Sequence, residues 1–172
     1  MIKLLGAMMI MAAGAMLGFG QARRLRERPA ELRRLVMMLQ QLETEIEYGC
    51  TPLPEALGKF ARPDRQALSE MMAGIASLLR RGGGVTVEEA WRLSVDEYWP
   101  CTSMNREDRE IFVQLGTVLG TSDREDQLKH LRLTAALLKE REAEAAEERR
   151  KYEKMWKSLG LLGGALIVVI LY

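Results

Sequence analysis

The sequence has few of the residues that metal sites and disulfide frameworks require. Among 172 residues it holds one histidine, His130, and two cysteines, Cys50 and Cys101, neither in a Cys-x-x-Cys pattern. A single imidazole excludes most metalloenzyme sites, and two cysteines are too few for a disulfide framework. We therefore expect both thiols to be buried or half-buried.

The sequence also lacks an excess of charge of either sign. Its 25 Lys and Arg residues nearly balance 24 Asp and Glu residues, and the formal net charge is +1 at pH 7. A general nucleic-acid-binding domain usually carries a large basic excess, so nucleic acid is not an expected partner. Proline and strand-like alternation are scarce, whereas apolar residues recur every three or four positions, which predicts an all-α protein.

Motifs for catalysis and cofactor binding are missing as well. The Gly82–Gly84 triplet is not followed by the Gly-Lys-Ser/Thr of a phosphate-binding loop. A carboxylate-bridged metal bundle is the nearest alternative, with these candidate ligands on predicted helices: Glu43, Glu47, Asp126 and His130. Such bundles normally use two Glu-x-x-His pairs, and here position 127 is glutamine with no second histidine in the chain. We expect no metal, no cofactor and no enzymatic activity.

Apolar stripes and cap residues predict a bundle of six helices. The first begins at Pro29, carries a stripe from Leu32 to Ile46 and ends at Gly49, which we expect to be a left-handed C-cap. The other five are expected to begin at these caps: Thr51-Pro52, Asp64, Thr86 with Glu89, Asn105 with Asp108, and Ser122 with Glu125. Trp91, Tyr98 and Trp99 are expected core anchors.

Both ends of the chain are apolar and have a basic flank on the side of the bundle. Leu4–Gly20 carries no charge, and arginines follow it directly. A cleavable signal peptide is the competing interpretation. Basic residues that follow an apolar segment resist translocation and mark its cytoplasmic side, which favours an uncleaved membrane anchor. The residues expected to flank the membrane are Arg23, Arg24, Arg26, Arg28, Lys154, Trp156 and Lys157.

The last helix is predicted to run without a break from Ser122 to the C-terminus. At about 1.5 Å per residue, roughly 48 residues would measure about 70 Å. Its apolar end, Leu159–Tyr172, is short for a bilayer core, so we expect it to pair with the N-terminal anchor. The predicted organisation is a transmembrane segment at 1–20, a cytoplasmic bundle at 21–139, a helical stalk at 140–157 and a second transmembrane segment at 158–172.

Two polar groups of residues are candidate contacts for a partner. One is the acidic end of the first bundle helix, with Glu43, Glu45 and Glu47, and the other is the polar start of the last helix, with Asp123, Arg124, Glu125, Asp126, Lys129 and His130. A solvated helix face is the alternative interpretation of the glutamates. Capping accounts for Glu125 but not for Arg124, which favours a contact role.

Five ordered blocks of sequence carry a family resemblance. They are Arg24–Pro29, Leu42–Gly49, Thr51–Leu57, Leu119–Leu131 and Lys154–Gly160. Through them the chain resembles the stage III sporulation protein AB family of endospore-forming bacteria over its full length. The middle of the chain, Phe60–Asp108, holds no matching motif, so its assignment to the family depends on its helical pattern alone.

The resemblance implies a membrane protein of the mother cell, in the outer forespore membrane, within the complex that joins mother cell and forespore. It also implies a cytoplasmic bundle similar to that of type II secretion F proteins, and a non-enzymatic role in coupling an ATPase to a channel. The implied partners are membrane lipid, the secretion-type ATPase of the complex (stage III sporulation protein AA), other channel subunits and a second copy of the chain. A passive membrane-tethered scaffold that never meets the ATPase is the alternative.

Overall fold

A computed structural model describes the backbone of residues 2–49, 51–61 and 66–171, and the side chains of residues 24–49, 51–61 and 66–152. Over these residues the chain forms six α-helices, one short 3-10 helix and no strand, which confirms the all-α prediction. The elements are α1 (Ile2–Glu47), α2 (Leu53–Gly58), α3 (Ala67–Arg80), α4 (Val87–Tyr98), η1 (Trp99–Cys101), α5 (Arg106–Leu119) and α6 (Arg124–Leu171).

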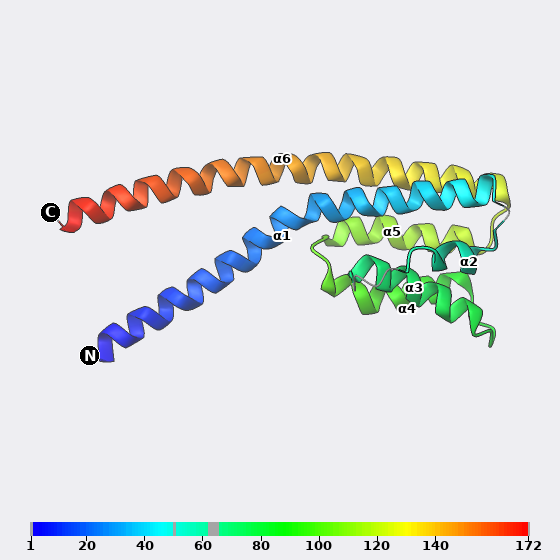
Figure 1. Ribbon diagram of the computed structural model, residues 1–172, viewed down its shortest axis with the longest axis horizontal. Helices are drawn as coiled ribbons and strands as arrows, with labels where there is room; N and C mark the ends of the chain where they lie inside the picture. Colours follow the sequence, from blue (N-terminus) through cyan, green and yellow to red (C-terminus); the bar gives the residue numbers. More distant parts are fainter. Residues whose placement is uncertain (1, 50, 62–65, 172) are drawn as a thin grey trace.

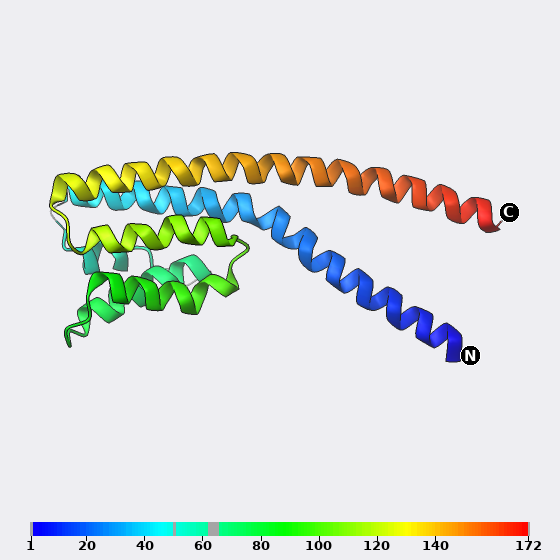
Figure 2. The same cartoon turned by 180° about the vertical axis from the view of Figure 1, so that it is seen from behind.

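Two long antiparallel helices, α1 and α6, form the spine of the molecule (Figure 1). The shorter helices α2 to α5 pack along one half of this pair, and the two termini extend from the other half toward the same side (Figures 1 and 2). α6 is one helix of 48 residues, as the sequence predicts, and therefore measures about 70 Å. α1 has 46 residues, so the N-terminal apolar segment and the first bundle helix are continuous.

The predicted transmembrane segments at 1–20 and 158–172 lie outside the residues whose side chains are described. Within the described part of the chain, no helix has a stretch long and apolar enough to cross a membrane. The predicted domain boundaries on either side of the stalk fall inside α6, whose backbone stays helical across both. α6 also keeps packing beyond residue 139, because Ala145 is only 2% exposed.

Pro29 does not begin a helix, as the sequence predicted, but lies inside α1. Proline lacks the amide that would bond the carbonyl four residues earlier, and its ring crowds that carbonyl, so it bends a helix without necessarily ending it. α1 changes direction between its blue N-terminal half and its cyan C-terminal half (Figure 1). The buried position of Pro29 against the bundle holds the helix together across this point.

Two predicted capping boxes are confirmed. The Thr86 hydroxyl accepts a hydrogen bond from the Glu89 amide at 3.2 Å, and the Glu89 carboxylate accepts one from the Thr86 amide at 3.1 Å. Asn105 and Asp108 make the same reciprocal pair at 2.9 Å in both directions. The local sequence therefore sets the starts of α4 and α5.

Other predicted caps differ in the structure. Gly49 is not left-handed: its amide continues the helical pattern to the Glu45 carbonyl at 3.0 Å, and the glycines with positive φ are Gly82, Gly83 and Gly84. Close packing explains the glycine instead, since a Cβ at position 49 would lie 2.7 Å from that carbonyl oxygen. Thr51 does not cap α2, because its hydroxyl donates to the Glu45 carboxylate.

The cap of α6 is Asp123 and not Ser122. The Asp123 carboxylate accepts a hydrogen bond from the Asp126 amide at 2.9 Å, and α6 begins at the next residue, Arg124. The predicted capping box with Glu125 therefore does not form. The predicted cap of α3, Asp64, lies outside the described residues, and α3 begins after Gln66.

The core forms where the predicted apolar stripes meet. Along α1, Leu32, Leu35, Leu39 and Leu42 are all at most 1% exposed. On α4, Trp91 is fully buried, its indole nitrogen donates to the Phe112 carbonyl at 2.9 Å, and the two rings lie 4.8 Å apart. These contacts confirm the expected role of Trp91 as a core anchor.

Cys101 contradicts the expectation of a buried thiol. It ends the 3-10 turn η1 between α4 and α5, and its side chain is exposed. The buried side of this turn is occupied by Trp99, two residues earlier, which is 7% exposed and packs against Phe112. Cys50 lies outside the described residues.

Gly116→Ala provides a test of the α4–α5 contact. A Cβ at this position would lie 2.6 Å from Cδ1 and 2.7 Å from Cβ of Trp91, so the substitution forces α4 and α5 apart. We expect a loss of about 1–3 kcal/mol in the free energy of unfolding, measured by urea denaturation, although alanine favours a helix by about 1 kcal/mol over glycine. The control Thr117→Ala, on the exposed side of α5, should change it by less than about 0.5 kcal/mol. A more stable Gly116→Ala protein would show that this contact is not tight.

Candidate interaction surface

The structure brings the two predicted contact groups together. α1 ends where α6 begins, so the acidic end of one helix lies beside the polar start of the other, at the end of the bundle opposite both termini (Figure 1). We call this region the tip, defined by residues 43–48 and 123–132. The two segments are nearly 80 residues apart in sequence, and tertiary packing alone places them side by side.

Arg124 joins the two halves of the tip. Its Nε donates to the Ile46 carbonyl at 3.0 Å, and its Nη2 donates to the Glu47 carbonyl. The last carbonyls of a helix have no partner within the helix, and an arginine side chain that reaches them also complements the negative end of the helix dipole. Arg124 therefore acts as a cap for α1 that comes from another helix.

The three glutamates at the end of α1 are engaged within the molecule. Arg132 of α6 contacts Glu43 at 2.5 Å and Glu47 at 3.1 Å. Glu45 contacts the Lys59 ammonium at 2.6 Å, and the hydrogen bond from Lys59 lowers the pKa of this carboxyl below its ordinary value. These side chains hold α1 against α6 and the end of α2, so they shape the tip more than they face outward.

The polar start of α6 retains side chains that are not engaged. Glu125 and Lys129 are exposed and make no hydrogen bond or ion pair with any described residue. With Asp123 and Asp126 they line a shallow hollow of about 230 Å³. Asp126 also lies 4.0 Å from the His130 imidazole. This part of the candidate set is available to a partner.

Tyr48 belongs to the tip, and the sequence pattern missed it. Its side chain is 77% exposed, the largest exposure among the large hydrophobic residues at the described positions. It follows Glu47, whose carbonyl Arg124 holds. The sequence could have indicated this, because Tyr48 does not belong to the apolar stripe that ends at Ile46. An aromatic residue outside a core stripe is a candidate binding residue.

Arg28 departs from the expected role in the membrane flank. Its side chain is only 10% exposed and binds the fully buried Asp108 of α5 through two hydrogen bonds, at 2.9 and 3.0 Å. It also contacts Glu148 of α6 at 3.3 Å, and Arg141 approaches Asp108 from the same helix. The bond to Asp108 raises the pKa of Arg28. This network ties α1, α5 and α6 together next to Pro29.

The other residues of the predicted membrane flank divide into two groups. Arg24 and Arg26 are exposed on α1, where nothing in the described structure opposes a role near lipid headgroups. Arg23, Lys154, Trp156 and Lys157 lie outside the described side chains. Their role remains a prediction.

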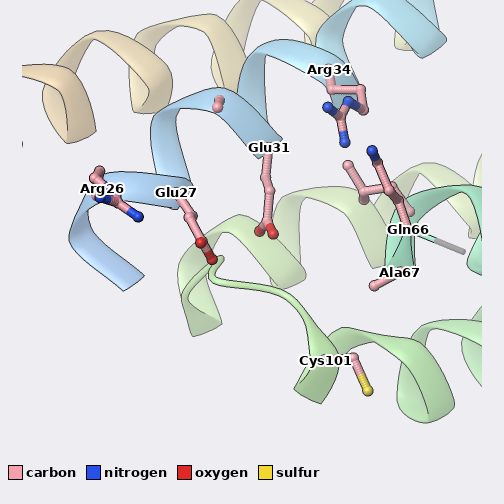
Figure 3. Close-up of a pocket in the computed structure, with 9 residues that line it drawn as sticks. Arg26, Glu27, Glu31, Arg34, Gln66, Ala67 and Cys101 are labelled. Carbon is pink, nitrogen blue, oxygen red and sulfur yellow. The ribbon is translucent and has the colours of Figure 1, made fainter. Parts of the chain in front are cut away.

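A hollow of about 410 Å³ lies beside α1, between Arg26, Arg34, Ala67 and Cys101 (Figure 3). Glu31 lies in its wall, where burial raises the pKa of the carboxyl and the Ser103 amide donates to it at 2.6 Å. This glutamate therefore fixes the loop between η1 and α5. Over the described residues, no three His, Cys, Asp or Glu side chains gather into a metal site, and Glu43 and Glu47, which the alternative metal bundle would require, bind Arg132.

These features define a helical protein with a long two-helix spine. Its charged side chains form ion pairs between helices and contribute to an exposed tip. The chain belongs to the stage III sporulation protein AB family, whose model matches residues 3–172. It is 38% identical, over 99% of both chains, to stage III sporulation protein AB of Bacillus subtilis (strain 168). A solved structure of stage III sporulation protein AB (SpoIIIAB) matches with a TM-score of 0.66 and 34% identity, over 72% of this chain and 96% of that chain. The family resemblance seen in the sequence is thus confirmed.

Arg28→Met tests the buried network. It leaves the Asp108 carboxylate buried without its bidentate partner, which should cost about 3–5 kcal/mol in the free energy of unfolding. The control Arg33→Met breaks an ion pair with Glu142 in which the arginine is 66% exposed, and should cost at most about 1 kcal/mol. Urea denaturation of both variants measures the difference. Equal losses of stability in the two variants would mean that Arg141 alone is enough to compensate the buried charge of Asp108.

Proposed function

We propose that this protein is a non-enzymatic platform subunit of the channel complex between mother cell and forespore, and that it couples a cytoplasmic secretion-type ATPase to that channel. The observation that carries the proposal is the tip: an exposed tyrosine and unengaged charges lie at the end of the spine opposite both termini. Membership of the sporulation family supplies the cellular context.

The arrangement of the long helices supports the topology. Both termini extend to the same side, so two apolar ends anchored in the mother-cell membrane leave the tip pointing away from the lipid (Figure 2). From Arg124 to Lys157, α6 would span about 50 Å. An ATPase dissolved in the cytoplasm reaches the tip without meeting the bilayer, whereas lipid and other channel subunits contact the opposite end.

Within the tip, the residues divide by role. Arg124, Arg132 and the glutamates of α1 build the surface, because their charges are satisfied between helices. Glu125 and Lys129 carry free charge, and Tyr48 offers an aromatic anchor of the kind that dominates binding energy at interfaces. Because Asp123, Glu125 and Asp126 outnumber Lys129 in the hollow, a basic and partly apolar surface on the ATPase complements the tip.

A charge exchange at the tip tests the coupling to the ATPase. Glu125→Lys combined with Lys129→Glu keeps the net charge but reverses both free charges, and circular dichroism checks that α6 still forms, because a lysine in its first turn opposes the helix dipole. We expect binding of the purified stage III sporulation protein AA ATPase, measured by interferometry with the full-length protein in nanodiscs, to weaken by at least about tenfold.

The matched control exchanges Lys139→Glu with Glu140→Lys, two exposed residues of α6 away from the tip. It should bind the ATPase like the wild type. Arg124 variants are less informative, because they also remove the cap of α1. Unchanged binding after the exchange at the tip would show that the ATPase contacts another surface.

The native thiol of Cys101 tests the topology. In a Cys50→Ser background, exposed Cys101 is the reporter in the bundle. In non-sporulating cells that express the protein in the cell membrane, a membrane-impermeant maleimide should leave it unlabelled while the cells are intact and label it after permeabilisation, because the bundle is cytoplasmic. A Cys50→Ser, Cys101→Ser protein provides the blank. Labelling of intact cells would place the bundle outside the cytoplasm and exclude the ATPase partner.

A passive scaffold is the second candidate function, and one observation favours it. Most charged residues of the tip are paired within the molecule, which a purely structural end of a bundle also requires. In that case the wild-type protein co-purifies with other channel subunits, or with a second copy of itself, and shows no binding to the ATPase.

A further inference from the structure

A third hollow adjoins the one in Figure 3, because Arg34 lines both of them. It has a volume of about 370 Å³, within the range of ligand pockets, and α1, the turn after α2 and the start of α3 form its walls. Arg34, Met37 and Gln41 contribute from α1, opposite Phe60 and Ser69. No part of the proposed function uses these residues.

The hydroxyl of Ser69 is an unexplained polar group in this hollow. Ser69 is 1% exposed, and its Oγ makes no hydrogen bond. A buried polar atom loses its bonds to water on folding, and native structures normally replace them. The Ser69 hydroxyl therefore has an unmet hydrogen-bonding requirement at the wall of the hollow.

Cationic donors surround the same space. The Arg34 guanidinium interacts electrostatically with Glu31 on the same helix but makes no hydrogen bond or ion pair within 4 Å of a described residue, and it points from α1 toward the start of α3 at Gln66 (Figure 3). Lys59 uses one of its three N–H groups for Glu45. No acidic residue is found among the described side chains that line the hollow. Arg34 and the Ser69 hydroxyl can each donate to an acceptor that carries negative charge.

The remaining wall is apolar and adaptable. Met38 and Phe60 are buried at 7% and 4% exposure, whereas the neighbouring Met37 is 54% exposed. Methionine side chains are flexible and polarisable, and they recur on surfaces that accept varied peptide side chains. A free phosphate ion would use the donors but would leave this wall without a contact.

We propose that this hollow binds an acidic, partly apolar peptide segment of a partner protein. The carboxylate of an Asp or Glu side chain accepts hydrogen bonds from Arg34 and Ser69, and an adjacent apolar side chain packs on Met37 and Phe60. Contact with the carboxylate satisfies the Ser69 hydroxyl. The site contains no residue of the tip, although Lys59 at its edge pairs with Glu45, so the protein can hold this segment and the ATPase at once.

Selection from a phage-displayed library of random dodecapeptides, on the full-length protein in nanodiscs, tests the proposal. We expect enriched peptides to carry Asp or Glu next to Leu, Met or Phe. Binding of the best peptide should weaken roughly tenfold in Arg34→Gln, and to a similar extent when its acidic residue is replaced by the amide. The matched control Arg92→Gln, an exposed arginine of α4, should bind like the wild type.

Ser69→Ala separates binding from folding. Removal of a buried hydroxyl without a partner should keep or raise the melting temperature of the free protein, while binding of the peptide weakens about threefold. Three outcomes overturn the proposal: selected peptides without acidic residues, unchanged binding in Arg34→Gln, or inorganic phosphate alone binding more tightly than the peptide. None of them bears on binding of the ATPase at the tip.

Discussion

The antiparallel packing of α1 against α6 is the constraint on which the rest of this structure depends. It places Arg124 on the last carbonyls of α1, Arg132 beside Glu43 and Glu47, and Arg33 beside Glu142. At the end where the helices separate, Arg28 bridges from α1 to Asp108 and Glu148. These contacts fix the register of two helices that would otherwise slide along an apolar seam of leucines.

The charged contacts differ in their energetic weight along this pair. Arg28 and Asp108 are both buried, so separating them would leave a desolvated charge, and this is the contact that holds the three helices together. The ion pairs of the tip are more exposed and individually weaker, but they fix geometry there. The strongest charged contact thus lies where α1 leaves the bundle, and a polar surface lies at the far end.

The sequence predicted much of the fold because most of the information was local. Apolar spacing identified the buried faces of α1 and α3–α6, and reciprocal caps located the starts of α4 and α5. Errors arose where neighbours in space override the local pattern. Gly49 is required by the packing of Glu45 and not by its own φ, and Pro29 stays helical because the bundle covers it. Cys101 is exposed because Trp99 takes the buried side of the turn.

The sequence by itself determined the helical class, the continuous α6, the capped starts of α4 and α5, and the family, because periodicity, capping chemistry and ordered motifs are properties of nearby residues. Only the tertiary structure decided which charges are engaged. It assigned Arg124, Glu43 and Glu47 to the joint between helices, turned Arg28 inward, and left Glu125, Lys129 and Tyr48 exposed. Ion pairing and exposure depend on residues some 80 to 120 positions apart, and no local pattern encodes that distance.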